Sequence, residues 1–333
     1  MRSVRMLAAV VFGVLSLLPP AAQANCGAEG CPLVREGLGA NHGRFAFDLR
    51  YQDVTQDQLW NGTEKTDLAS IIADSELHGE VELYTRTRSW VAEGRVRITD
   101  DLRVSATLPY IEREHRHWLA HTPVFNPLFL DTWKYEGLAD ATVLGQYRVL
   151  HREGLPMVTV QGGVKLPTGK KHLDDEARDN LGFESTLEPS ARPGSGSTDW
   201  LAGALVSQQL PGKALLPLTL SVLARWNTKG TDDYEMGDEL QAGLSSGWSP
   251  IDRVTLLAQL NYSAHTSDIS AEASEAAHSG MKSLYATPGI TVRVSPMVSV
   301  YGLYQGRLWG KSDEATVVAN NHFLFGTTLS LGH

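Results

Sequence analysis

The sequence has no long apolar segment beyond its N-terminus, because no later stretch of about 18 residues is both strongly apolar and uncharged. A membrane-spanning helix needs about 20 such residues, so none is expected in the rest of the chain. Basic residues are also in the minority, 29 against 38 acidic ones, which makes nucleic acid an unexpected partner. If the chain enters a membrane, it must do so with strands.

The first 24 residues have the features of a secretory signal peptide. Arg2 and Arg5 precede an apolar run from Met6 to Leu18, and Ala22-Gln23-Ala24 supplies the small residues at which signal peptidase cuts. Without Arg2 and Arg5, the 29 basic residues fall to 27 against 38 acidic ones, a formal net charge of −11. We therefore expect an exported chain with residues 1–24 removed.

The only two cysteines, Cys26 and Cys31, lie in what would be a periplasmic N-terminal segment, residues 25–42. Export into an oxidising compartment favours a local disulfide between them. A metal-binding or thiol-exchange role stays open, because two cysteines alone do not define a zinc site.

From Gly43 onward, one pattern repeats: about ten residues alternate between apolar and polar or small, and then the pattern breaks. In the first unit Phe45, Phe47 and Leu49 share one face, while Asp48 and Arg50 share the other. About twelve such units occur, and bacterial barrels have even strand numbers. Residues 43–333 therefore predict an all-β fold, a transmembrane antiparallel up-and-down β-barrel in the outer membrane of a Gram-negative cell.

The breaks between units alternate in length, which is typical of periplasmic turns and extracellular loops. Short breaks are predicted at 99–101, 151–156, 211–213, 249–253 and 295–297. Longer ones are predicted at 55–78, 113–136, 168–197, 228–236, 265–281 and 310–320. Both chain ends then fall on the periplasmic side.

The two faces of the predicted strands differ in charge. The inward face would carry ten basic and five acidic side chains, whereas the outward face carries essentially none. A charge facing lipid costs about 2 to 4 kcal/mol at mid-bilayer, which a soluble sandwich would not have to avoid. The inward set is Arg44, Arg50, Arg95, Arg97, Arg103, Arg148, Lys165, Arg225, Arg293 and Arg307, with Asp48, Glu93, Asp140, Asp199 and Glu239. Outward aromatic residues near strand ends predict interfacial girdles: Trp90, Tyr110, Tyr147, Trp200, Trp226, Trp248 and Tyr262.

Several motifs in residues 80 to 210 resemble the outer-membrane transporter family named for the meta-pathway of phenol degradation. They are Leu108-Pro109-Tyr110, Gly137-Leu138-Ala139-Asp140, the segment from Gly162 to Gly169, and Gly194-Ser195-Gly196-Ser197-Thr198-Asp199. Ala139 departs from the glycine usual at that position of the family. The resemblance implies a barrel that transports small organic compounds and supplies no catalytic residues. Read physically, the Lys165-Leu166-Pro167-Thr168-Gly169 element ends a strand, because proline cannot donate to the ladder and glycine permits the turn.

Two groups of polar residues in predicted loops could carry other chemistry. His115, His117 and His121 have a spacing that can gather imidazoles around zinc or copper, although loop histidines are usually solvated. An acidic loop with Asp174, Asp175, Glu176 and Asp179 lacks the glycine and spacing of a calcium site. No metal and no cofactor is expected.

An enzyme is the main competing class, since some barrels of this size hydrolyse lipids with serine and histidine. His265 and Ser267 are close in sequence but have no motif around them, so we expect no catalysis. A structural or adhesive barrel without transport is the other alternative.

Interleaved with the inward charges are apolar side chains, which make the predicted lumen amphipathic: Val91, Leu144, Met157, Leu201, Leu205, Leu223, Leu257, Tyr285, Tyr301 and Leu303. Such a wall suits passive diffusion of small aromatic or amphipathic compounds, including acids, with Arg95, Arg97 and Arg103 compensating a carboxylate. About half of the inward arginines are expected to pair with carboxylates instead. Expected partners are outer-membrane lipid and lipopolysaccharide, the barrel assembly machinery and a small-molecule solute.

Overall fold

The computed structural model describes residues 43–73, 80–119, 130–152, 154–171, 189–211, 217–270 and 279–332. The predicted signal peptide, the segment with Cys26 and Cys31, the acidic residues 174 to 179, and His121 lie outside this part of the chain. Within it, no helix is both long and apolar enough to span a bilayer.

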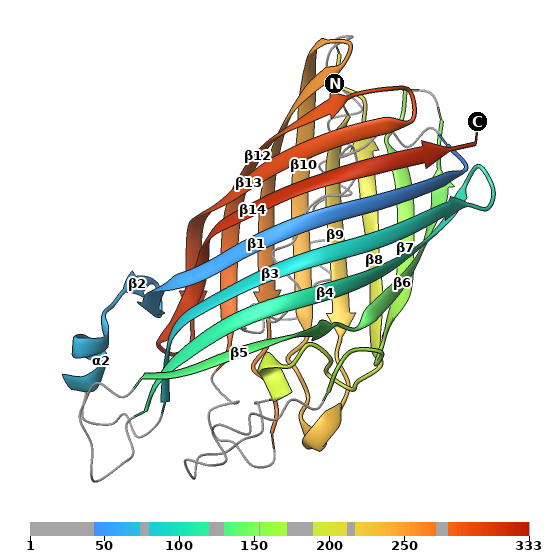
Figure 1. Cartoon of the computed structure of the whole chain (residues 1–333). Coiled ribbons are helices and arrows are strands. Elements are labelled where there is room, and N and C mark those ends of the chain that lie inside the picture. The colour runs from blue at the N-terminus through green and yellow to red at the C-terminus, as the bar shows by residue number, and fades with distance from the viewer. Residues whose placement is uncertain are drawn as a thin grey trace.

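The described chain forms one closed antiparallel β-barrel of 12 strands, as the sequence predicts. Fourteen strand segments are present in the described chain: β1 (Phe45–Asn61), β2 (Glu64–Lys65), β3 (Glu80–Arg97), β4 (Leu102–Leu119), β5 (Leu130–Leu138), β6 (Ala141–Leu150), β7 (Met157–Leu166), β8 (Asp199–Gln208), β9 (Leu218–Trp226), β10 (Glu239–Ile251), β11 (Val254–His265), β12 (Met281–Arg293), β13 (Val298–Ser312) and β14 (Thr316–Leu331). The barrel has twelve strands because β2 lies outside it and β5 and β6 share one position. Helix α2 (Leu68–Ala73) and the short β2 stand outside the barrel, beyond one end of β1 (Figure 1).

β5 and β6 together fill one position in the barrel, because both pair with β4. β5 pairs with the segment Tyr110 to Trp118, and β6 with the segment Leu102 to Thr107. The break between them falls at Ala139 and Asp140, where the amide of Ala139 donates to the carbonyl of Pro109 at 2.9 Å. Two of the sequence motifs, Leu108-Pro109-Tyr110 and Gly137-Leu138-Ala139-Asp140, thus meet where this strand is interrupted.

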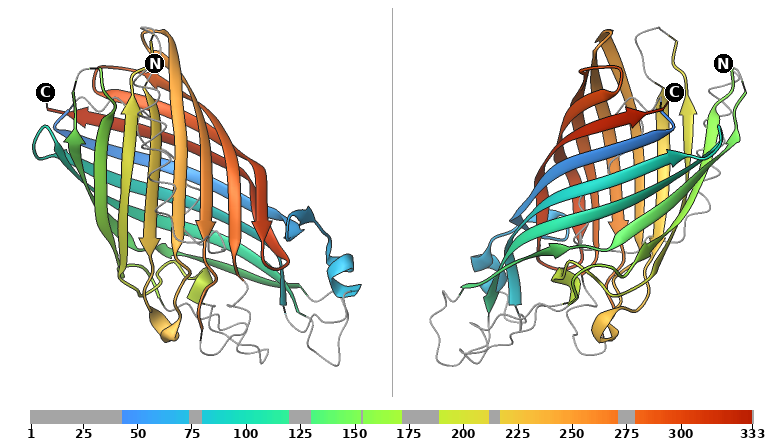
Figure 2. Two further views of the ribbon diagram at one scale, coloured as in Figure 1. Left: turned by 180° about the vertical axis from the view of Figure 1, so that it is seen from behind. Right: turned by 45° about the vertical axis from the view of Figure 1, so that its right-hand side comes forward.

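Strand β14 closes the barrel by pairing with β1. The register runs from Phe45 opposite Leu331 to Trp60 opposite Thr316, with two irregularities near Gln56. The amide of Arg44 extends the seam by donating to the carbonyl of Gly332 at 2.7 Å. The start of β1 and the end of β14 therefore lie at the same end of the barrel, which also carries most of the short turns (Figures 1 and 2).

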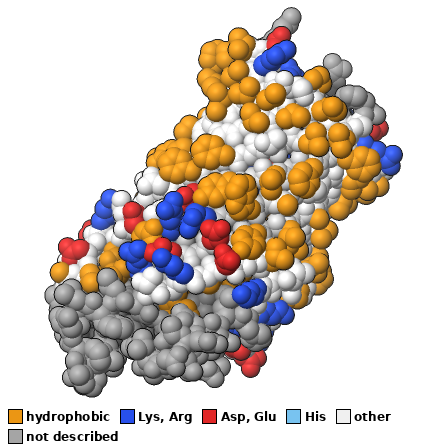
Figure 3. Space-filling view, viewed as in Figure 1, with side chains coloured by type: hydrophobic (Ala, Val, Ile, Leu, Met, Phe, Trp, Pro, Cys, Tyr) orange, Lys and Arg blue, Asp and Glu red, His pale blue; other side chains and the backbone are white. Residues whose placement is uncertain are grey.

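Side chains alternate along the strands as predicted. On β1, Phe45, Phe47 and Leu49 are exposed while Asp48 and Arg50 are buried. The predicted girdle residues Trp90, Tyr147, Trp200, Trp226 and Trp248 are all exposed on the outer face. Figure 3 shows hydrophobic side chains spread over the outer wall, as expected for a surface in contact with lipid. The protein is an outer-membrane β-barrel, and the lipid-facing belt is its apolar outer surface.

Several predicted loops are wrong in their extent, because strands continue through them. β1 extends into the predicted break 55–78, and the predicted loop 113–136 consists largely of the end of β4 and nearly all of β5. The break 310–320 shrinks to residues 313–315. In the extensions of β4 and β5 the outward side chains are polar, for example Glu114, Lys134 and Glu136, so the apolar alternation that identified the strands disappears while the pairing continues.

Candidate functional site in the barrel lumen

Toward the periplasmic end the inner wall carries a buried charge network on β1, β3, β13 and β14. Arg50 lies 3.0 Å from both Asp48 and Glu93, and Arg95 lies 3.3 Å from Glu93. Asp48 also accepts hydrogen bonds from the hydroxyls of Tyr301 at 2.9 Å and Thr328 at 2.7 Å. The carboxylates of Asp48 and Glu93 thus have partners, and the predicted pairing of some inward arginines applies to Arg50 and Arg95.

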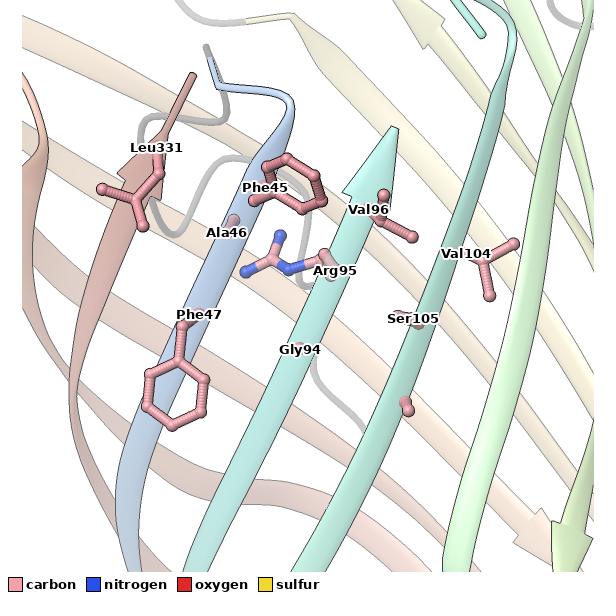
Figure 4. A pocket seen from close by; sticks show the side chains of 10 residues that line it. Phe45, Ala46, Phe47, Gly94, Arg95, Val96, Val104, Ser105 and Leu331 are labelled. Atoms are coloured by element: carbon pink, nitrogen blue, oxygen red, sulfur yellow. The ribbon is translucent and has the colours of Figure 1, made fainter. Parts of the chain in front are cut away.

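Figure 4 shows the surroundings of Arg95 at the periplasmic end of β1, β3 and β4. Pairing places Ala46 and Ser105 opposite Arg95, so its cross-strand neighbours are small. The alternate residues Phe45, Phe47, Val96, Val104 and Leu331 line a shallow groove over Gly94. A Cβ added to Gly94 would meet nothing within 4 Å, and Phe45, Phe47 and Leu331 face outward, so this groove lies open on the outer wall and not in the lumen.

At the extracellular end, the family-like motifs converge on one buried cluster around Lys165. Its ammonium lies 2.5 Å from Asp199 and 3.2 Å from Asp140, and it donates to Ser195 Oγ at 2.5 Å and Ser197 Oγ at 3.2 Å. Asp140 also accepts from the amide of Gly169 at 2.9 Å. The polar residues of three motifs therefore join the break after β5 to the ends of β7 and β8, which agrees with their interpretation as architecture.

Lys165 and Ser195 have the separation of a serine–lysine catalytic pair, but the charges around them oppose that role. A lysine base must lose its proton, and here the ammonium is the counter-charge to two buried carboxylates, Asp140 and Asp199. Ser195 Oγ in turn donates to Asp140 at 2.7 Å. The arrangement braces the wall and does not activate a nucleophile.

A third polar group lies on β9, β10 and β11, where Arg225 lies 2.7 Å from Glu239 and His265 Nε2 lies 3.8 Å from the same carboxylate. His265 is the last residue of β11 and lies in the wall, while Ser267 follows in the connection. Near it, Asp268 is buried and accepts hydrogen bonds from the amide of Gly237 at 2.7 Å and from the hydroxyl of Tyr234. Burial, the largest influence, raises the pKa of Asp268.

The described end of the connection between β7 and β8, residues 189–192, packs against side chains of β4 and β5. Residues Pro189–Ala191 form a single 3-10 turn, and Ala191 packs with Trp133 and Tyr135 of β5. Arg113 of β4 donates to the Ala191 carbonyl at 3.2 Å. Arg192 is held by Asp232 of the next long connection at 2.6 Å. These contacts tie the segment to β4, β5 and the next long connection, and no sequence pattern indicated them.

The remaining predicted inward bases lie toward the periplasmic end, apart from Arg307. Arg148 lies 3.6 Å from Asp101, and Arg293 donates to the Asp252 carbonyl. Arg44 lies over the ring of Phe45, and Arg307 over that of Trp60 at 4.4 Å. Arg97 and Arg103 stand directly opposite each other on β3 and β4. Among the residues that the structure describes, neither of these two arginines has a carboxylate partner.

Apolar side chains cover another part of the inner wall. Leu257, Tyr301, Leu303 and Leu324 form one buried cluster on β11, β13 and β14. Val54, Tyr285 and Ala319 form a second on β1, β12 and β14. Polar and apolar patches therefore alternate around the lumen.

The predicted histidine loop is wrong, because His115 and His117 belong to strand β4. His115 is buried, and its Nδ1 contacts both Thr85 Oγ and, at 3.3 Å, Glu82. Both of these contacts use the same ring nitrogen, Nδ1. No group of three or more possible metal-ligating side chains occurs in the described part of the chain.

Comparison with known proteins agrees with the barrel class. No family model and no curated protein matches the sequence, so the resemblance to the phenol-degradation family is not confirmed at that level. Among solved structures, the COG4313 outer membrane channel from Pseudomonas putida F1 superimposes with a TM-score of 0.59 at 11% identity, covering 90% of this chain and 99% of that one.

Two other solved barrels align less closely. A Pseudomonas aeruginosa FadL homologue gives a TM-score of 0.46 at 8% identity, covering 93% of this chain and 100% of that one. The CymD monoaromatic hydrocarbon channel gives 0.41 at 9% identity, covering 94% and 98%.

Proposed function

We propose that the protein is a passive outer-membrane channel for small aromatic or amphipathic organic compounds, with a preference for acids. The observation that carries this proposal is the juxtaposition of Arg97 and Arg103 without a carboxylate partner in the described chain, in a lumen that also has apolar walls. A structural or adhesive barrel remains the alternative, and a lipid-hydrolysing barrel is disfavoured because the ammonium of Lys165 is the counter-charge to Asp140 and Asp199.

The pairing of all five inward carboxylates with other basic residues supports a role in transport for these two arginines. Asp48 and Glu93 are engaged by Arg50 and Arg95, Asp140 and Asp199 by Lys165, and Glu239 by Arg225. Like charges directly opposite each other in a sheet destabilise it, so the Arg97–Arg103 pair is unfavourable unless an anion lies between the guanidinium groups. A carboxylate or phenolate matches the donor geometry of such groups.

Apolar surface close to the arginines supports an amphipathic solute over a simple inorganic anion. Arg103 pairs with Gln146, and Leu144 lies two residues further along the same face of β6. Leu201 on β8 and Leu223 on β9 continue this face, and both are partly exposed. A solute could therefore place its charged group at the arginines while its ring or chain contacts leucines.

The test replaces Arg97 and Arg103 together with glutamine, which keeps size and polarity but removes both charges. We expect the reversal potential of the purified channel in planar bilayers to shift toward cations, and uptake of benzoate by whole cells to slow several-fold. Arg253→Gln is the matched control, since Arg253 is exposed on the turn between β10 and β11. Arg95 is left intact because it pairs with Glu93.

Two outcomes would count against the proposal in different ways. Unchanged ion selectivity and benzoate uptake in the double variant would remove the preference for acids and leave these arginines without a role in transport. A folded wild-type protein that neither conducts nor admits any organic solute would remove the channel function and favour the structural barrel.

A further inference from the structure

The outer wall changes character abruptly along one row of aromatic side chains on β1, β3 and β4. Strand pairing places Tyr51 opposite Trp90 and Trp90 opposite Tyr110, and the rings of Tyr51 and Trp90 are 5.1 Å apart. Aromatic rows of this kind mark the boundary between hydrocarbon and headgroups. The segments beyond the row therefore stand at the level of the headgroups and above it.

Immediately beyond this boundary the outward side chains are charged. The next row along β1, β3, β4 and β5 is Asp53, Arg88, Glu112 and Glu136, and the row after it contains Arg86, Glu114 and Lys134. Figure 3 shows these basic and acidic side chains gathered between the hydrophobic belt and the end with the long connections. We call these two rows the charged wall.

A second basic group lies at the same boundary on β12 and β13. Trp309 pairs with Leu284, and the next outward residues, Lys282 and Lys311, stand directly opposite each other. No carboxylate pairs with either lysine among the residues that the structure describes. Two ammonium groups facing each other across a ladder destabilise it unless an anion compensates them.

The basic residues of the charged wall are only loosely held. Arg88 lies 3.5 Å from Glu112, and Lys134 lies 3.8 Å from Glu114 with 71% of its side chain exposed. Exposed pairs of this kind contribute about 0 to 1 kcal/mol. Arg86 differs, because it makes two hydrogen bonds to Asp53 at 2.6 and 3.0 Å. Arg88, Lys134, Lys282 and Lys311 are therefore the cations most able to take another anionic partner.

Arg88, Lys134, Lys282 and Lys311 lie on one side of the barrel. On the opposite side, Trp200 is the second residue of β8 and Trp226 the last of β9, so these strands end at their aromatic residues. The strands that carry the basic groups continue past theirs. The asymmetry is more than a uniform solubilising rim would require.

We propose that the outer wall beyond the aromatic row binds the phosphorylated headgroup of lipopolysaccharide, through Lys282 and Lys311 on β12 and β13 and through Arg88 and Lys134 on the charged wall. Phosphate groups of this lipid lie at the top of the hydrocarbon layer, level with these side chains, and ammonium and guanidinium groups are their natural protein partners. Glu112 and Glu136, which face each other, would share the divalent cations that accompany those phosphates.

The test measures binding of purified lipopolysaccharide to the full-length protein in detergent. The readout is the rise in the unfolding temperature of the protein on unboiled gels. We expect the variant with Arg88, Lys134, Lys282 and Lys311 changed to glutamine to bind at least tenfold more weakly than wild type. The control, Lys229→Gln with Arg253→Gln, removes two exposed charges away from this wall and should bind normally. Either pair alone, Lys282→Gln with Lys311→Gln or Arg88→Gln with Lys134→Gln, serves if the fourfold variant does not fold.

Two further ligands, phosphatidylglycerol micelles and inorganic phosphate, distinguish lipopolysaccharide from other sources of phosphate. The proposal requires lipopolysaccharide to bind more tightly than either, and ion selectivity in planar bilayers to be the same in variant and wild type. Equal binding of all three ligands, or unchanged lipopolysaccharide binding by the variants, would overturn it.

Discussion

Charged side chains in this barrel differ chiefly in whether they have partners. Lys165 is nearly completely buried, and its ammonium is shared by Asp140 and Asp199. Arg97 has the same inward orientation in the strand pattern but has an arginine opposite it. The first environment holds the wall together, and the second leaves charge available to a solute.

Replacement of Lys165 by methionine should weaken the extracellular end of the barrel, because it leaves two buried carboxylates without a counter-charge. Breaking a buried pair in this way costs about 3 to 5 kcal/mol. We expect a lower unfolding temperature on unboiled gels and faster proteolysis of the connection between β7 and β8. Lys170→Met, an exposed lysine on the same connection, should change neither.

A second replacement distinguishes charge from packing at Lys165. The triple variant Asp140→Asn, Lys165→Met and Asp199→Asn removes all three charges together, so most of the lost stability should return. If the triple variant is as unstable as Lys165→Met alone, the effect comes from packing and not from the uncompensated carboxylates.

Asp268 provides a test of pH dependence in a loop. Its pKa is raised because it is buried, so the folded loop binds a proton more readily than the unfolded loop. This contribution to stability is present at low pH and is lost as the pH rises through the raised pKa. Hydrogen exchange at Gly237, whose amide donates to Asp268, should therefore slow as the pH is lowered from neutral toward the ordinary pKa of an aspartate, after correction for the intrinsic pH dependence of exchange.

The matched variant for this loop is Asp268→Asn, which removes the titrating group and keeps one carbonyl oxygen for the Gly237 amide. In that variant the corrected exchange rate should no longer depend on pH. A pH dependence equal to that of wild type would assign the effect to another group.

At the level of strands, the alternation of side chains was enough to predict the barrel, its strand number and the face on which residues such as Asp48 and Phe47 lie. It worked because lipid demands an apolar outer face wherever the wall crosses the membrane. Beyond the aromatic row the outer side chains no longer contact the hydrocarbon of the membrane. Both faces of β4 therefore become polar around Arg113 and Glu114. The sequence therefore predicted a loop where the strand continues.

Partners across strands could not be predicted, because they depend on register. The inward positions of Glu93 and Arg97 follow from the strand pattern, but only the observed register places Glu93 within reach of Arg50 and Arg103 opposite Arg97. The same limit applies to the family-like motifs. Lys165, Ser195 and Asp140 are far apart in sequence, and their common cluster requires the break after β5 and the inward course of the β7–β8 connection.

The orientation of the whole molecule yields a further prediction. Long connections at one end and most short turns at the other place Lys134 outside the cell and Asp100, in the turn between β3 and β4, in the periplasm. Single cysteines at these two positions, in a background lacking Cys26 and Cys31, should react differently with a membrane-impermeant thiol reagent. Lys134→Cys should be labelled in intact cells and Asp100→Cys only after lysis; the reverse would invert the topology.

The seam between β1 and β14 joins the first described strand to the last, so its contacts span nearly the whole sequence. Until β14 is in place, β1 has a free edge of unpaired amides and carbonyls, which invites pairing with another chain. Contacts between such distant segments form late, because closing the longest loop costs the most conformational entropy before the hydrogen bonds between β1 and β14 can form. A truncation that removes β14 would therefore leave a chain with most of its hairpins intact and with an open strand edge. Loss of these sixteen residues should cause aggregation and not merely a modest loss of stability.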